Sequence, residues 1–296
     1  MTSTLKVLLV INPISGGINK DQKISALKNK FKEFQISFTE YLTTGNDDTE
    51  NIRALINEQT PNRILVLGGD GTIKMVAEAV HSEEIAVGII PAGSSNGLAH
   101  SLGIPDDLET QLEVALGDHI IAVDKIKIND EICLHIADLG INAELIRNYE
   151  NSNVRGKLGY LMQSIPTIFS CDYPFEFTIE LNNQTIKKTG ILLVIANARK
   201  YGTGATVNPS GKINDRTFEL LIYKKLDLVE IIKTLREKVE MNPEFVECYP
   251  ANSACIRCAE KVPFQIDGEF IAEVSELKVE LSSEQLKLAC PFQFKS

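Results

Sequence analysis

The sequence lacks the features that would place it in several common classes of protein. It has no basic excess: 30 Lys and Arg against 40 Asp and Glu give a formal net charge of −10 at pH 7. Non-specific nucleic-acid binding needs a basic footprint, so we expect no nucleic-acid partner. No uncharged apolar run reaches the roughly 18 residues of a membrane-spanning helix, and no leader-like segment opens the chain. We therefore expect a cytoplasmic protein.

Familiar phosphate-binding motifs are also missing. The sequence contains no GxxxxGK[ST] motif of P-loop NTPases, no HRD or DFG motif of protein kinases, and no GxGxxG motif. Its six cysteines are scattered over 296 residues. That spacing favours reduced thiols over a disulfide framework. Any nucleotide chemistry must therefore depend on another kind of loop.

The order of the expected elements predicts two domains. Residues 1–125 repeat a buried strand, a glycine-containing loop and a helix, which predicts an α/β domain with a mostly parallel sheet. Strands dominate residues 126–296, with two helices near residues 158–169 and 226–238, which predicts an antiparallel second domain. Whether the last strand, within residues 277–294, returns to the first domain is left open.

One stretch of the first domain predicts an anion-binding turn. The apolar residues 64–67 end at Gly68-Gly69-Asp70-Gly71-Thr72, and a helical pattern begins at once. Glycines let a phosphate approach the backbone N–H groups of such a turn. Phosphates would repel Asp70 unless a cation or a substrate hydroxyl lay between them, so Asp70 is a candidate for Mg²⁺ organisation or proton acceptance. Alternatively, Asp70 only caps the helix.

Three further segments carry candidate chemistry. Residues 12–17 and 91–99 are glycine- and serine-containing loops that follow buried strands. Asp267-Gly268 follows the apolar strand 262–266 and is a hairpin signal. The hairpin would present Asp267 and Glu269 at a strand end, although an ordinary exposed turn explains these residues equally well.

Together, residues 12–17, 68–72 and 91–99, with 208–219 and 267–269, resemble the diacylglycerol kinase catalytic-domain family. This family includes bacterial diacylglycerol and lipid kinases and the sphingosine and ceramide kinases. Residues 68–72 alone would also fit NAD kinases and phosphofructokinases. The resemblance implies an NAD kinase-like nucleotide-binding domain and a β-sandwich-like lipid-substrate domain. It also implies transfer of the ATP γ-phosphate to a lipid hydroxyl in the cleft between the two domains.

The resemblance also implies roles for individual residues. The implied nucleotide contacts are Asn12, Thr43, Gly68, Gly69, Asp70, Gly71, Thr72, Ser94 and Asn96. Asp70, Asp267 and Glu269 form the implied catalytic set, with Glu269 slightly favoured over Asp267 as general base. The cofactors are ATP and Mg²⁺. A structural Mg²⁺ would be held by Asp215 and by the carbonyls of Lys212 and Thr217, although Arg216 stands where the family usually has glycine.

The lipid acceptor and the partners are less closely defined. Both a diacylglycerol-like and a sphingoid lipid are open, because Glu144 lies about where sphingosine kinases place an acid for the lipid amine. A solvated helix start is the alternative reading of Glu144. We expect transient peripheral membrane contact through a basic patch and leave a homodimer open. The patch residues are Arg155, Lys157, Arg199 and Lys200.

Two other functions are also open. One is an NAD kinase-like enzyme that acts on a soluble nucleotide. The other is a catalytically silent regulator that binds a nucleotide. The presence of Asp70, Asp267 and Glu269 argues against the silent regulator.

Overall fold

The computed structural model describes residues 5–17, 20–82, 84–150, 174–201, 205–209, 211–225 and 242–294. The helices expected near residues 158–169 and 226–238 lie outside these ranges, as do Arg155 and Lys157. The chain forms two compact units, one comprising Met1–Val123 with Ser283–Ser296 and the other comprising Asp124–Ser282. Within the described ranges, no helix combines the length and the apolar character needed to cross a membrane.

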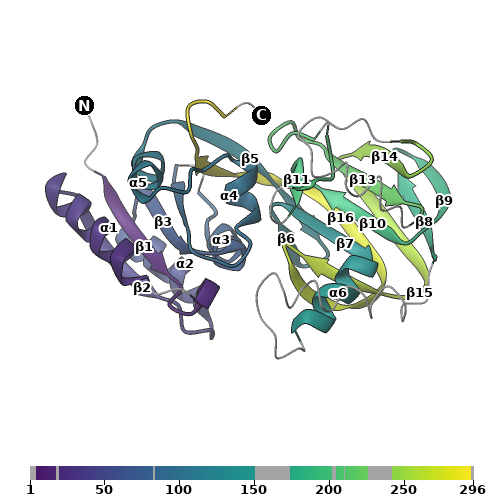
Figure 1. Cartoon of the computed structure of the whole chain (residues 1–296), viewed down its shortest axis with the longest axis horizontal. Coiled ribbons are helices and arrows are strands. Elements are labelled where there is room, and N and C mark those ends of the chain that lie inside the picture. Colours follow the sequence, from purple (N-terminus) through teal and green to yellow (C-terminus); the bar gives the residue numbers. More distant parts are fainter. Residues whose placement is uncertain are drawn as a thin grey trace. The chain divides into compact units, whose positions relative to one another are not determined.

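A parallel sheet forms the centre of the first unit (Figure 1). Its strands are β1 (Lys6–Ile11), β2 (Ser37–Leu42), β3 (Arg63–Gly68) and β4 (Ala86–Pro91), in the order β2-β1-β3-β4. The end of β16 (Glu269–Ala289) adds a parallel neighbour to β4. Every residue of β3 is buried, as expected for a strand that is covered on both faces.

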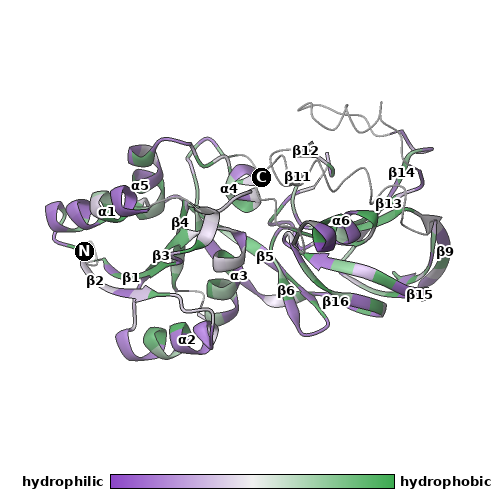
Figure 2. Ribbon diagram, turned by 60° about the horizontal axis from the view of Figure 1, so that its bottom comes forward, coloured by the Kyte–Doolittle hydropathy of each residue, from purple (hydrophilic) through white to green (hydrophobic). Residues whose placement is uncertain are grey.

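Helices cover both faces of this sheet. Figure 2 shows α1 (Asp21–Glu33) and α5 (Leu108–Leu116) on one side and α2 (Asp48–Gln59) and α3 (Asp70–Ala79) on the other. Phe31 of α1 and Leu112 of α5 pack in one core cluster with Leu9 of β1. Two short elements, η1 (Ser15–Gly17) and α4 (Gly97–Ser101), lie in the loops after β1 and β4. The predicted α/β domain with a parallel sheet is confirmed.

The second unit is built from antiparallel strands. One run has the order β14-β13-β10-β7-β15-β16, while β8 joins β15 to β9 and β5 joins β16 to β6. The elements are β5 (Ile120–Ile128), β6 (Glu131–Cys133), β7 (Ile136–Gly140), α6 (Ile141–Glu150), β8 (Phe175–Leu181), β9 (Gln184–Gly190), β10 (Leu192–Ala196), β11 (Lys200–Tyr201), β12 (Ala205–Thr206), β13 (Phe218–Tyr223), β14 (Val246–Ala251) and β15 (Ser253–Ile266).

The long strand β15 takes part in both layers of this unit. Its first half pairs with β8 and its last residues pair with β7, and the register shifts between Arg257 and Val262. One core cluster joins Phe177 of β8 to Leu193 of β10 and Leu220 of β13. The predicted antiparallel β-sandwich-like domain is therefore confirmed.

One predicted strand is divided in the structure. The sequence predicts a strand over residues 131–137, but β6 ends at Cys133 and β7 begins at Ile136. The Asp267 carboxylate accepts hydrogen bonds from the backbone N–H groups of Leu134, His135 and Ile136, at 3.0 Å each. N–H groups that bind a carboxylate cannot also serve a strand ladder, so the strand is interrupted here.

Candidate functional site

The loops predicted to bind the nucleotide lie at one edge of the parallel sheet. Ile11 at the end of β1 is paired with Leu42 of β2 and with Leu67 of β3, and β3 pairs with β4 up to Pro91. The segments that follow these strands therefore start side by side. Ligands of open α/β sheets bind outside the carboxyl ends of the strands. The fold thus brings residues 12–17, 43–47, 68–72 and 91–97 to the expected edge.

Asn12 ties the first of these loops to the third. Its Oδ1 accepts the N–H groups of Ile14 and Ser15, both at 3.1 Å, and so holds its own loop in a turn. Its Nδ2 donates to Oγ1 of the buried Thr72 at 3.2 Å. Its backbone N–H donates to the carbonyl of Leu67 at 3.0 Å. Asn12 and Thr72, both predicted nucleotide contacts, are thus direct neighbours.

Gly69 and Gly93 bring the loops after β3 and β4 into backbone contact. A Cβ built at Gly69 would lie 2.9 Å from the Cα of Gly93, and one built at Gly93 would lie 2.5 Å from the Cα of Gly69. Real Cβ atoms do not approach backbone this closely. Both positions therefore require glycine for loop packing, independently of any phosphate. Gly68 ends β3 and Gly71 lies in the first turn of α3.

Asp70 binds the loop after β4. Its Oδ2 accepts the N–H of Gly97 at 2.8 Å and its Oδ1 accepts the N–H of Leu98 at 3.0 Å. The carboxylate thereby satisfies two N–H groups at the start of α4, which have no partner within the helix. The alternative reading of Asp70 as a cap has a structural basis, but the helix that it caps is α4 rather than α3.

Ser94 and Asn96 differ in what their side chains do. Ser94 is exposed at the tip of the loop after β4. Asn96 has a left-handed backbone with φ 53°. Its Oδ1 accepts the N–H of Gly93 at 2.8 Å, and its Nδ2 donates to the Gly93 carbonyl at 3.0 Å. The Asn96 side chain therefore stabilises its own loop, while Ser94 faces solvent.

Asp48 organises the loop that contains Thr43. The half-buried Thr43 is anchored by its N–H, which donates to the Ile11 carbonyl at 2.9 Å. Burial alone would raise the pKa of Asp48, but the Tyr41 hydroxyl and the N–H groups of Thr44 and Gly45 outweigh burial and lower it. An ionised, hydrogen-bonded Asp48 at the start of α2 fixes this loop.

Two lysines lie against the backbone of these loops. The Lys20 ammonium donates to the carbonyls of Ser15 and Pro13, and Lys23 donates to the carbonyl of Pro91. Burial lowers the pKa of both lysines, and the charge of Lys20 lowers that of Lys23 further. Nothing in the sequence marks these two lysines, because a lysine in a polar helix start is usually solvated.

The second unit contains the other predicted catalytic residues, on the hairpin between β15 and β16. Asp267 and Gly268 have φ 51° and 92°, as a type I′ hairpin turn requires. The Asp267 carboxylate accepts the N–H groups of Leu134, His135 and Ile136, where the chain passes from β6 into β7. Glu269 is exposed as the first residue of β16. Asp267 therefore anchors a neighbouring loop, whereas Glu269 faces solvent.

A buried carboxylate, that of Asp138, is linked to the same hairpin through Gln265. Asp138 on β7 is 1 % exposed and accepts hydrogen bonds at its Oδ2 from Asn142 at 2.6 Å and Gln265 at 2.5 Å. The Gln265 Oε1 in turn accepts the N–H of Gly268 at 2.8 Å. Burial raises the pKa of Asp138 to about 7. Asp138 was not among the predicted site residues, although an aspartate inside an apolar strand is a signal that the sequence offers.

The predicted structural Mg²⁺ ligands fit a divalent cation poorly. Oδ1 of Asp215 accepts the N–H of Thr217 at 3.2 Å, as in an Asx turn. Arg216, between them, directs its guanidinium to the buried Asp124. Across the described ranges, no group of three His, Cys, Asp or Glu side chains is arranged to hold a metal ion. Metal binding by Lys212, Asp215 and Thr217 stays a prediction.

Glu144, the residue considered for sphingoid recognition, is part of an ion-pair chain. Its Oε1 accepts from Arg147 at 2.6 Å, and Arg147 also donates to Glu273 at 2.6 Å.

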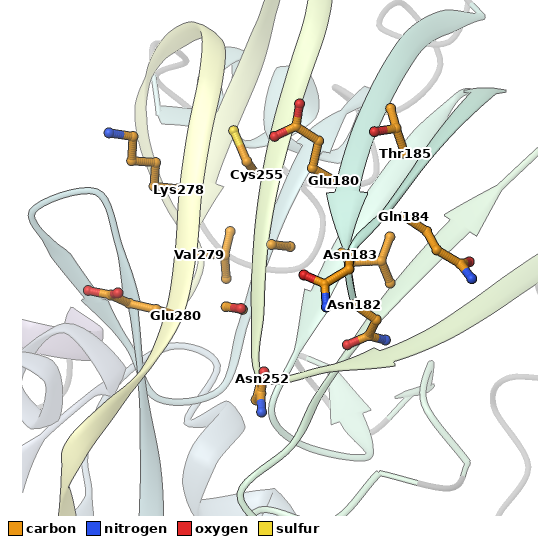
Figure 3. Close-up of a pocket in the computed structure, with 13 residues that line it drawn as sticks. Glu180, Asn182, Asn183, Gln184, Thr185, Asn252, Cys255, Lys278, Val279 and Glu280 are labelled. Carbon is orange, nitrogen blue, oxygen red and sulfur yellow. The ribbon is translucent and has the colours of Figure 1, made fainter.

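A separate hollow in the second unit is lined by polar residues that include Asn182, Asn183 and Lys278 (Figure 3). None of the predicted site residues lines that hollow, so we assign no function to it.

Family models match nearly the whole chain. Residues 6–128 match the diacylglycerol kinase catalytic domain. Residues 136–290 match the YegS C-terminal NAD kinase beta sandwich-like domain.

Named relatives agree with these matches. The diacylglycerol kinase of Bacillus subtilis (strain 168) is 24% identical over 270 residues, covering 88% of this chain and 89% of the relative. The probable lipid kinase YegS of Shigella dysenteriae serotype 1 (strain Sd197) is 27% identical over 212 residues, covering 70% of this chain and 71% of the relative. The crystal structure of a diacylglycerol kinase from Bacillus anthracis str. Sterne shares the fold, with a TM-score of 0.75 and 18% identity over 100% of both chains. The chain belongs to the diacylglycerol kinase catalytic-domain family.

Proposed function

We propose that this protein transfers the γ-phosphate of ATP to the hydroxyl group of a lipid. Membership in a kinase family supports phosphoryl transfer. The observation that carries the proposal is the linkage of three loops at the carboxyl edge of the parallel sheet. Asn12 binds Thr72, and Asp70 binds the N–H groups of Gly97 and Leu98. These bonds pre-organise a backbone surface of the kind that receives phosphates.

The loops of the first unit would hold the nucleotide. Gly69 and Gly93 let the loops after β3 and β4 pack backbone against backbone, which fixes the surface that would face the phosphates. Lys20 and Lys23 place positive charge against the same loops. Mg²⁺ bound with ATP would supply further neutralisation of the phosphate charge.

Glu269 is our candidate for the general base. The Asp267 carboxylate already accepts three backbone N–H groups, whereas Glu269 is exposed at the start of β16. In the proposed step, Glu269 accepts the proton of the lipid hydroxyl while that oxygen bonds to the γ-phosphorus. The bond from the γ-phosphorus to the β–γ bridging oxygen breaks, and ADP leaves.

The ion-pair chain at Glu144 favours an uncharged acceptor. A sphingoid amine would need a carboxylate that is available to pair with it, but Glu144 binds Arg147 at 2.6 Å and is only 12% exposed. We therefore propose a diacylglycerol-like lipid in preference to a sphingoid base. Contact with a membrane surface, which such a substrate requires, stays a prediction.

The test is an acceptor screen with purified protein, radiolabelled ATP and Mg²⁺. Mixed micelles would present diacylglycerol, sphingosine, ceramide or a total lipid extract, and NAD would be supplied in solution. We expect label in phosphatidic acid. Label in sphingosine phosphate would overturn the proposed acceptor, and label in NADP would support the soluble-nucleotide alternative. No labelled product in any arm would support the catalytically silent regulator.

A further inference from the structure

The loop that leads from Lys212 to Thr217 contains an unusual residue. Arg216 has a left-handed backbone, with φ 61°. A side chain rarely adopts this region, and the strain persists only where the surroundings hold it. The family resemblance implies glycine at this position. This chain therefore keeps the backbone conformation of a glycine and adds a cationic side chain.

The Arg216 side chain neutralises a buried carboxylate. The Asp124 side chain is 0% exposed. Its Oδ2 accepts the Arg216 backbone N–H at 2.7 Å, and its Oδ1 accepts Nη1 of the guanidinium at 3.1 Å. A carboxylate removed from water is costly unless it is paired and hydrogen-bonded. Arg216 supplies both the charge and the donors.

The same contacts close the loop. The Asp124 N–H donates to the carbonyl of Ile213 at 2.9 Å, so both the backbone and the side chain of Asp124 bind the loop. The second guanidinium nitrogen of Arg216 donates to the carbonyl of Ser282 at 2.6 Å. One arginine thus joins the loop to the start of the unit at Asp124 and to its end at Ser282.

We infer that Arg216 replaces the structural Mg²⁺ that the family resemblance assigns to this loop, so that the loop is locked by an internal cation and needs no metal ion. A divalent cation beside the guanidinium would meet like charge. Asp215, the carboxylate of the implied ligand set, already accepts the Thr217 N–H at 3.2 Å. The inference concerns stability and does not depend on the proposed acceptor or on turnover.

The experiment is thermal unfolding of the full chain without nucleotide or lipid, in EDTA and in millimolar Mg²⁺. We expect the Tm of the wild type to be the same in both solutions. Arg216→Ala should lower Tm by roughly 5–10 °C, because it removes the guanidinium that pairs with a buried carboxylate. Arg257→Ala is the matched control. The Arg257 side chain is 44% exposed against 43% for Arg216, but its partners Glu180 and Glu276 are exposed, so we expect a fall of about 2 °C or less.

Two further variants complete the test. Arg216→Gly introduces the glycine that the resemblance implies, and we expect its Tm to rise on adding Mg²⁺, because the cation can then pair with the carboxylates of Asp124 and Asp215 in place of the guanidinium. If Arg216→Ala does not fold, adding Asp124→Asn should restore folding by removing the buried charge. A wild-type Tm that rises in Mg²⁺ and loses this rise in Asp215→Ala would overturn the inference. Equal losses in Arg216→Ala and Arg257→Ala would overturn it as well.

Discussion

Asp138 carries the clearest pH dependence at the scale of single residues. Burial raises its pKa to about 7 in the folded state, against roughly 3.9 for an exposed aspartate. Between these values the folded chain holds a proton that the unfolded chain releases. The free energy of unfolding therefore falls as pH rises from about 3.9 to about 7, by up to about 4 kcal/mol in total. Above about pH 7 this group causes no further loss.

Asp138→Asn should remove this dependence. The asparagine amide is uncharged at every pH, and its oxygen can still accept from Asn142 and Gln265. We expect the Tm advantage of the variant over the wild type to grow by several degrees between pH 5 and pH 8. Thermal unfolding from pH 5 to pH 8 checks this. Parallel curves for the two proteins would rule out titration of Asp138 in this range.

Asp70 is the second residue whose role can be separated by measurement. Asp70→Asn puts an NH₂ group opposite one of the two N–H donors of Gly97 and Leu98. Loss of this hydrogen bond should lower the free energy of unfolding by about 1–3 kcal/mol. The variant should also bind ATP less tightly, because the loop is no longer held in place. We expect a lower Tm and a higher KM for ATP. If kcat alone collapses while Tm and KM stay unchanged, Asp70 acts on the reacting atoms instead.

The sequence singles out residues in the loops that are predicted to bind the nucleotide, but it does not reveal their hydrogen-bond partners. Asn12, Asp70 and Thr72 stand out because they follow buried strands in glycine-rich turns. The bond from Asn12 to Thr72 spans 60 residues, and the bond from Asp70 to Gly97 spans 27. Local patterns do not specify such pairs. For the same reason the support of the hairpin by Asp138 escaped the sequence analysis.

The loops after β3 and β4 require glycine where their backbones touch, at Gly69 and Gly93. Gly93→Ala places a methyl group 2.5 Å from the Cα of Gly69, so the loops after β3 and β4 must separate. We expect about 1–3 kcal/mol of destabilisation and loss of ATP binding, measured by unfolding and by titration calorimetry. Gly103→Ala is the control, because its Cβ would meet nothing within 4 Å although its φ is +68°.

That control isolates backbone strain from loop packing. Gly103→Ala should lose stability without losing affinity for ATP. If Gly93→Ala bound ATP as tightly as Gly103→Ala does, loop contact would not shape the nucleotide site.

The elements themselves were largely predictable, because the buried strands β1, β3 and β4 read as apolar runs. The division between β6 and β7 was not, because it depends on Asp267, which is 131 residues from Ile136.

Both ends of the chain belong to the first unit, and the second unit is the continuous segment between them. β16 begins in the second unit, and its last residues pair with β4 in the first, with Leu288 opposite Val87. Leu288 is fully buried, whereas Phe292 is 85% exposed four residues later. Leu288→Ala should therefore destabilise the first unit by about 2–5 kcal/mol, and Phe292→Ala should leave it within about 0.5 kcal/mol of wild type. Chemical denaturation of both variants compares these outcomes, and equal midpoints would contradict the role of β16.

The change from parallel to antiparallel strands was visible in the sequence. Strands that alternate with helices gave way to successive strands, and the fold follows this order. The sequence predicts a boundary after residue 125, and the N-terminal segment of the first unit ends at Val123. The return of residues 283–296 to the first unit was left open, because an apolar strand pattern does not say which sheet receives it.

The most direct test of the whole account compares phosphoryl transfer by wild type, Glu269→Gln and Glu276→Gln with diacylglycerol as acceptor. Both glutamates are exposed on β16, and Glu276 pairs with Arg257, so Glu276→Gln controls for loss of a surface carboxylate. We expect Glu269→Gln to lower kcat by roughly 100-fold or more, with Tm and the KM for ATP unchanged, and Glu276→Gln to retain full activity. Wild-type turnover by Glu269→Gln would contradict the assignment of the base, and absence of lipid phosphorylation by the wild type would contradict the function itself.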